Sequence, residues 1–201
     1  MKKILLAGLM MAGIAVTAKA QKGSVLLYGD LSFGSSKNSA ETKNTSFDFN
    51  PGVGYQFNNN WTAGLNLGIG SDKTTPAGTT PTITKNSNFN VGPFVRYTQP
   101  LAGVFSIFGQ LNANYLSGKT KTEVGSVSAE SKYDGFGINL FPAIGVNLKN
   151  NFALNFNFGG LGYTTTKNKA AGSNSNNSFG LTFGQFMNIG ISKNFGGSKK
   201  K

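Results

Sequence analysis

The chain has 201 residues with a net charge of +12, and it contains neither cysteine nor histidine. These absences exclude disulfides, thiolate metal sites, Ser-His-Asp triads and Cys-His pairs. Charged residues make up only 13% of the chain, about half the share in a typical soluble domain, whereas phenylalanine (17) and glycine (28) are abundant. The many aromatic residues argue against a disordered chain, and the scattering of lysines through polar segments and the tail argues against a nucleic-acid groove.

The first predicted element is a secretory signal peptide at residues 1–20. Two lysines precede an apolar run of 13 residues, which is followed by the small-residue ending Ala18-Lys19-Ala20. A permanent helical anchor would need roughly 20 apolar residues, so the run is short for that alternative. We therefore expect cleavage after Ala20, a mature domain over residues 21–195 and a basic tail over 196–201.

From residue 21 onward, apolar residues recur at every second position, which is the period of a β-strand. Gly159-Gly160 predicts a bulge in the seventh segment, and Gln185 interrupts the apolar series of the last, which indicates either a bulge or a partner contact. The eight predicted strands cover about 25–33, 46–57, 61–70, 88–98, 105–115, 135–148, 152–158 and 179–195.

The connections between these strands alternate in length. Long polar loops are expected at 35–44, 71–86, 117–131 and 164–177, and short turns at 58–60, 98–103 and 149–151. Strands that run up and down would place all long loops at one end of the sheet, and all short turns and both termini at the other. Closure would remove the unpaired edges, so the predicted fold is all-β, an eight-stranded antiparallel up-and-down barrel.

Two kinds of barrel fit this topology, and the polar face distinguishes them. A soluble lipocalin-like barrel turns a charged face to water, whereas a transmembrane barrel turns its apolar face to lipid and fills its interior with polar residues. Gly, Asn, Ser, Thr and Gln dominate the polar face here, and its clear charges are Asp30, Asp48 and Arg96. A water-facing surface would be about 25 to 35% charged, so the pattern favours the transmembrane β-barrel.

Aromatic residues gather near both ends of the predicted strands, where amphipathic rings would lie at membrane interfaces. At the short-turn end they are Tyr55, Phe57, Trp61, Tyr97, Phe152 and Phe195. At the other end they are Phe33, Phe47, Phe89, Tyr115, Tyr163 and Phe179.

The charged residues of the polar face offer two interpretations. If the loop at 35–44 closes a regular hairpin, Asp30 and Asp48 lie nearly opposite each other and point inward. Two close carboxylates can share a proton as a catalytic dyad. We favour a structural ion cluster in the lumen with Arg96 or a lysine, because structural networks produce the same grouping. We expect no catalytic residue, cofactor or metal, and therefore no enzymatic activity.

Several segments resemble the small eight-stranded outer-membrane barrels of Gram-negative bacteria, the OmpA-domain and OmpX-like family. The resemblance covers about residues 22–195 and is carried by "GSVLLYGDLSF", the repeated "GYQFNNNWTAGLNLG" and "GVNLKNNFALNFNFG", and the closing "FMNIGISKNF". It implies residence in the cell outer membrane and a terminal aromatic, here Phe195, that the barrel-assembly machinery reads. The chain departs from the family pattern because "GGSKKK" follows Phe195.

The sequence leaves three functions open. The first is a structural or adhesive role exerted through four long extracellular loops, with outer-membrane lipid and a host or cell-surface molecule as partners of a monomer. The second is a narrow pore, or a route for a small apolar ligand through the wall. The third is a soluble lipocalin-like carrier. Eight strands leave a filled interior, and four inward phenylalanines would add bulk, which disfavours an open channel. These are Phe94, Phe108, Phe141 and Phe186.

Overall fold

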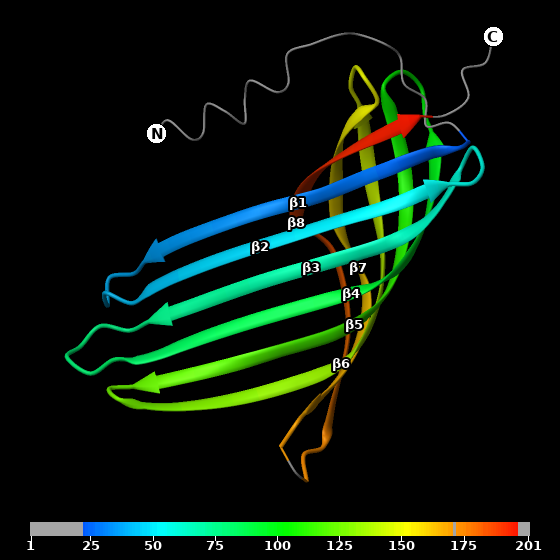
Figure 1. Cartoon of the computed structure of the whole chain (residues 1–201). Coiled ribbons are helices and arrows are strands. Elements are labelled where there is room, and N and C mark those ends of the chain that lie inside the picture. The colour runs from blue at the N-terminus through cyan, green and yellow to red at the C-terminus, as the bar shows by residue number, and fades with distance from the viewer. Residues whose placement is uncertain (1–21, 171, 197–201) are drawn as a thin grey trace.

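The computed structural model describes residues 22–170 and 172–196, and all regular structure within them is β-strand (Figure 1). The expected signal peptide and most of the expected tail lie outside the described residues. No helix in the described part of the chain could span a membrane. The strands are β1 (Ser24–Lys37), β2 (Lys43–Gln56), β3 (Trp61–Thr75), β4 (Thr82–Pro100), β5 (Phe105–Val124), β6 (Val127–Asn147), β7 (Phe152–Asn168) and β8 (Ser175–Gly196).

The strands form one antiparallel sheet in chain order, which β1 and β8 close into a barrel. The predicted fold is therefore confirmed. Three short connections, 57–60, 101–104 and 148–151, define what we call the short-turn end, where the described chain also begins and ends. The connections at the opposite end, which we call the extended end, are 38–42, 76–81, 125–126 and 169–174.

The predicted long loops are wrong, because the strands run through most of each polar segment. The segment 117–131, for example, is a continuous hairpin in which Lys119 pairs with Lys132 and Val124 with Val127 across a two-residue turn. Gly125, at φ +57, adopts the left-handed conformation that such a turn requires. Threonine and valine favour extended backbone, so these segments stay paired although neither of their faces is apolar.

The alternation of faces agrees with the prediction. The inward side chains of Phe94 and Phe108 are buried, whereas outward Leu65 and Phe183 are 58% and 74% exposed. Gly54 and Gly64 make room for the inward ring, since a Cβ on either glycine would lie less than 3 Å from an atom of Phe94. The barrel therefore has a packed interior and a continuous apolar exterior.

Gly159 in β7 and Gln185 in β8, which the sequence analysis singled out, both lie where the strand pairing is irregular. The β7–β8 register shifts between Asn157 and Gly159, where one residue of β7 faces the four residues 184–187 of β8. Gly159 and Gly184 have φ values of +115 and +75, which favour glycine. The predicted bulge at Gly159 is confirmed, and Gln185 lies in the bulged part of β8.

The β1–β8 seam closes the barrel over only part of its height. Six residue pairs join the two strands, from Ser24↔Gly196 to Gly29↔Ile191. Beyond them, residues 30–37 pair with β2 alone, and residues 175–183 and 188–190 pair with β7 alone. Figure 1 shows the blue β1 and the red-to-orange β8 diverging toward the extended end. The barrel is closed near the short turns and splayed beyond them.

Candidate functional site

The short-turn half of the lumen is filled by a plug centred on Arg96 of β4, whose side chain is buried. Its guanidinium carbon lies 4.2 Å from the ring centre of Phe108 and 4.5 Å from that of Tyr28. Tyr28 in turn meets Phe94 edge to face, with ring centres 5.2 Å apart. A cation over aromatic faces in a desolvated site gains about 2 kcal/mol, so these rings stabilise a buried charge that has no carboxylate beside it.

Gln110 of β5 connects this aromatic cage to a row of amides. Its Oε1 accepts a hydrogen bond from Arg96 Nε at 2.7 Å, and its Nε2 donates to Tyr28 Oη at 2.9 Å and to Asn112 Oδ1 at 2.8 Å. Asn112 Nδ2 then donates to Asn139 Oδ1 at 2.9 Å. Inward polar groups from four strands are thus satisfied across the lumen, as buried polar groups must be.

The predicted ion cluster of Asp30, Asp48 and Arg96 does not form. Asp30 Oδ1 accepts from Asn50 Nδ2 at 2.8 Å, and Asp48 Oδ2 accepts from Ser32 Oγ at 3.2 Å. The β1–β2 register pairs each aspartate with one of these neutral residues, so the two carboxylates are offset by two positions. Among the described residues no ion pair joins Arg96 to a carboxylate, because the aromatic cage and Gln110 occupy its surroundings.

The described residues contain no cluster of three or more carboxylates that could hold a metal ion. Asp30 and Asp48 are at most half-buried and lie above the plug, in the part of the barrel that the β1–β8 seam leaves unpaired. In the hydrogen bonds of this region, each aspartate accepts from one neutral side chain, Asn50 or Ser32. These hydrogen bonds join β1 to β2.

The six aromatic residues expected at the short-turn end all lie there and point outward. Trp61 and Tyr97 pack together with ring centres 5.0 Å apart. The ammonium of Lys193 lies 4.4 Å from the ring centre of Phe152 and 4.9 Å from that of Phe195. Their placement suits an interfacial girdle, which stays a prediction.

A feature of the extended end escaped the sequence reasoning. Seven strands carry the same series of outward residues toward the extended end. It begins with an aromatic residue or an isoleucine, has a hydroxyl residue or Asp134 two positions further, and ends with a lysine two positions beyond that. The order on β5, for example, is Tyr115, Ser117, Lys119. The signal was visible in the sequence as a period-two series, but the polar half of each series was interpreted as loop. We call the seven lysines the lysine belt: Lys37, Lys43, Lys73, Lys85, Lys119, Lys132 and Lys167.

Carboxylates neutralise part of this end. Lys85 and Lys121 pair with Glu123 at 2.9 and 2.7 Å, and Lys119 and Lys132 pair with Glu130 at 3.3 and 3.0 Å. The hydrogen bonds from Lys121 and Lys85 lower the pKa of Glu123 to about 2. Both carboxylates are therefore ionised at neutral pH, and each is shared between two lysines.

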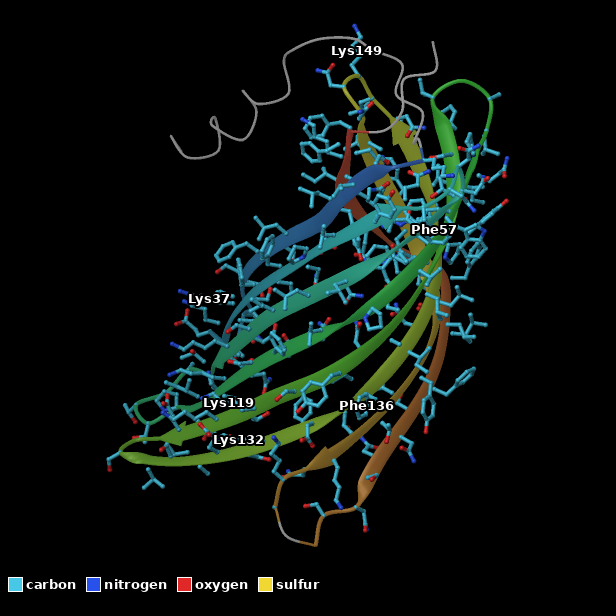
Figure 2. All side chains as sticks on the ribbon, turned by 45° about the vertical axis from the view of Figure 1, so that its right-hand side comes forward. Lys37, Phe57, Lys119, Lys132, Phe136 and Lys149 are labelled. Atoms are coloured by element: carbon cyan, nitrogen blue, oxygen red, sulfur yellow. The ribbon has the colours of Figure 1, made fainter. Side chains whose placement is uncertain are left out.

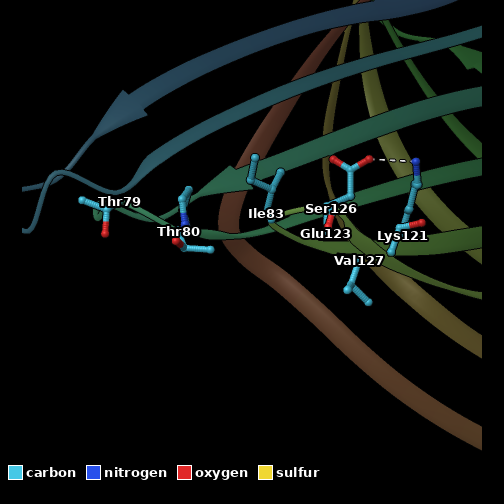
Figure 3. A pocket seen from close by; sticks show the side chains of 10 residues that line it. Thr79, Thr80, Ile83, Lys121, Glu123, Ser126 and Val127 are labelled. Carbon is cyan, nitrogen blue, oxygen red and sulfur yellow. Dashed lines mark ion pairs between the residues drawn. The ribbon is translucent and has the colours of Figure 1, made fainter.

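Two hollows lie between the strand ends here. One of about 560 Å³ separates the β3–β4 connection from the β5–β6 turn and is lined by Thr80, Ile83, Lys121 and Glu123 among others (Figure 3). The other, of about 640 Å³, lies between the β1–β2 and β3–β4 connections. Both are open, and they lack the enclosed walls of a small-molecule site.

Comparison with known proteins identifies the family to which this barrel belongs. A family model described as outer membrane protein beta-barrel domain matches residues 4–195. The outer membrane protein OprG from Pseudomonas aeruginosa is similar in structure, with a TM-score of 0.50 and 15% identity over 88% of this chain and 97% of OprG. At that identity the similarity establishes the fold alone.

Two further solved structures share less of the geometry. A major outer membrane protein from Thermus thermophilus has a TM-score of 0.48 and 14% identity, over 88% of this chain and 100% of that one. Ail, the attachment invasion locus protein of Yersinia pestis, has a TM-score of 0.41 and 16% identity, over 87% and 99% of the respective chains. No curated protein matches the sequence.

Proposed function

The chain belongs to the outer membrane protein beta-barrel domain family, and from this premise we propose that it has a non-enzymatic, structural or adhesive role exerted through the extended end. It is an outer-membrane β-barrel protein, and the extended end is the face we assign to the outside of the cell. Assembly machinery that reads Phe195 and a monomeric state belong to the same proposal.

The projecting hairpins carry this proposal. A tilted transmembrane strand needs roughly 9 to 11 residues, whereas β5 and β6 have 20 and 21. The excess lies at the extended end, where the β5–β6 ladder continues to its last pair, Val124↔Val127. A rigid, polar hairpin raised above a membrane presents a preformed surface at low entropic cost, which suits recognition of a partner.

The plug supports the same conclusion by disfavouring an axial pore. Phe94 and Phe108 are almost completely buried, and Gln110 bonds across the lumen to Tyr28. Eight-stranded barrels leave an interior just wide enough for side chains to fill. We expect no reproducible unitary currents in planar bilayers.

Shortening one hairpin tests the adhesive role. Thr120 and Ser131 are directly opposed and are the same type of pair as Val124↔Val127, which closes the native two-residue turn, so residues 121–130 can be replaced by Asn-Gly. The variant should fold, as judged by heat-modifiable migration in gels, and cells that carry it should lose attachment. A matched control replaces 149–150 by Asn-Gly at the short-turn end. Unchanged attachment after each of the four extended hairpins is shortened in turn would contradict the proposal.

A second candidate function follows from the β1–β8 seam. Pairing between these strands ends at Gly29↔Ile191, and the adjoining part of β8 presents Phe179, Leu181 and Phe183 outward, each at least 70% exposed. A small apolar molecule that enters the splayed half above the plug would have a lateral way into lipid. Proteoliposome uptake of an apolar dye, compared with protein-free liposomes, tests this route, and equal rates would exclude it.

A further inference from the structure

The lysine belt has a constant distance from the outward apolar residues below it. Each lysine lies four residues beyond its ring or isoleucine, as in Phe33 to Lys37 and Phe136 to Lys132. Four residues of strand measure about 13 Å, or roughly 10 Å along the membrane normal at a tilt near 40°. The polar headgroup zone is about 5 to 7 Å deep on each side of the hydrocarbon core, so flexible lysine side chains reach it from this height.

The belt also concentrates like charge. Three hairpins place two of its lysines directly opposite each other, in the pairs Lys37↔Lys43, Lys73↔Lys85 and Lys119↔Lys132. Like charges at directly opposed positions destabilise a sheet. An anion between the two ammonium groups would remove the repulsion, and a phosphate has the charge and the acceptor oxygens to do so.

The protein's own carboxylates neutralise only some of the belt lysines. Lys37, Lys85, Lys119 and Lys132 have ion-pair partners, whereas within the described residues none joins Lys43, Lys73 or Lys167, all of which are exposed. Figure 2 shows Lys37, Lys119 and Lys132 gathered toward one end of the barrel, and Lys149 at the other. The belt's seven lysines outnumber the three lysines that the described part of the chain places at the short-turn end, Lys22, Lys149 and Lys193, which favours the leaflet at the extended end.

We propose that the lysine belt binds the phosphate groups of anionic lipid headgroups in the leaflet at the extended end. The lysines hold the phosphates, the hydroxyls one step lower on six of the seven strands face the same zone, and the aromatic rings and Ile69 below pack against acyl chains. This lipid site is distinct from the adhesive role of the hairpin tips, and it uses the outward faces of the strands rather than their connections.

Two triple variants test the proposal. Lys43→Gln/Lys73→Gln/Lys167→Gln removes the belt lysines without ion pairs, and Lys22→Gln/Lys149→Gln/Lys193→Gln removes the same charge at the short-turn end. Each protein is folded in micelles with equimolar phosphatidylglycerol and phosphatidylcholine of identical acyl chains, and bound lipids are counted by native mass spectrometry. Heat-modifiable migration verifies that both variants fold.

The wild type should retain phosphatidylglycerol in preference to phosphatidylcholine. A surface lysine contributes about fivefold to anionic-lipid binding, so the belt variant should lose at least tenfold of this preference while the control keeps it. An equal loss in both variants, or no preference in the wild type, overturns the proposal. Binding of soluble polyphosphate in neutral micelles as tight as that of phosphatidylglycerol would assign the belt to a soluble polyanion and overturn the lipid assignment.

Discussion

The two halves of this barrel share one sequence pattern but differ in structure. The short-turn half is sealed by the β1–β8 ladder and filled by Arg96, Phe94, Phe108 and Gln110. In the extended half that ladder is missing, and inward positions such as Ser32 are exposed. Period-two alternation therefore determines which face meets lipid, while the size and bonding of the inward residues determine where the tube is packed.

The largest expected effect is the loss of stability caused by a substitution in the packed, short-turn half. Phe94→Ala should destabilise the barrel by about 3 to 5 kcal/mol, because the ring is buried and its neighbours cannot collapse into the space. Urea unfolding in lipid vesicles measures the loss. The matched control is inward Leu116→Ala in the extended half, where the side chain is only half-buried and about 1 kcal/mol should be lost. Equal losses at both sites would refute the contrast between the halves.

Pairs of introduced cysteines test where β1 and β8 lie next to each other and where they do not. The chain contains no other thiol that could compete. Leu27→Cys/Lys193→Cys joins directly opposed outward residues and should oxidise readily. Leu31→Cys/Ile189→Cys occupies the positions that the same register would pair if the ladder continued, and it should oxidise at least several-fold less. Comparable yields of both disulfides would show that the seam closes along its whole height.

The smallest effect concerns the extended half alone and depends on pH. The folded pKa of Glu123 lies below its ordinary value, so its contribution to stability is present above the unfolded pKa of about 4.3 and is lost as pH falls toward about 2. Amide exchange at the β5–β6 tip, normalised for intrinsic rates, should accelerate over this interval. Glu123→Gln should weaken the pH dependence, because Glu130 still titrates, while residues of the plug stay protected; a tip that is equally pH-dependent without Glu123 would contradict the assignment.

The sequence predicted the parts of the fold that depend on local pattern. Alternation located all eight strands and assigned Phe94 and Phe108 to the interior, and Gly159 marked a bulge. Strand ends were missed because polar residues on both faces of a hairpin look like loop, although ladder hydrogen bonds and ion pairs such as Lys85 to Glu123 hold them extended.

The candidate site was harder to predict because it depends on long-range register. Asp30 and Asp48 were expected to lie nearly opposite each other, but the connection at 38–42 sets Asp30 against Asn50 and Asp48 against Ser32. Gln110 is paired with Arg96 on the neighbouring strand β5, but Tyr28 reaches Arg96 from β1 across the lumen, and no local pattern encodes that approach. The lysine belt was encoded locally but was obscured by the loop interpretation.

The short β1–β8 ladder has a kinetic consequence. It joins the chain's most distant strands, since Val25 pairs with Phe195 across almost the whole described chain, and closing so long a loop costs more entropy than forming any neighbouring hairpin. The seven hairpin contacts should therefore assemble first as a curved, open sheet, and the six pairs of the seam should form last. The same six pairs should then separate first, so we expect unfolding of the barrel to begin at the β1–β8 seam.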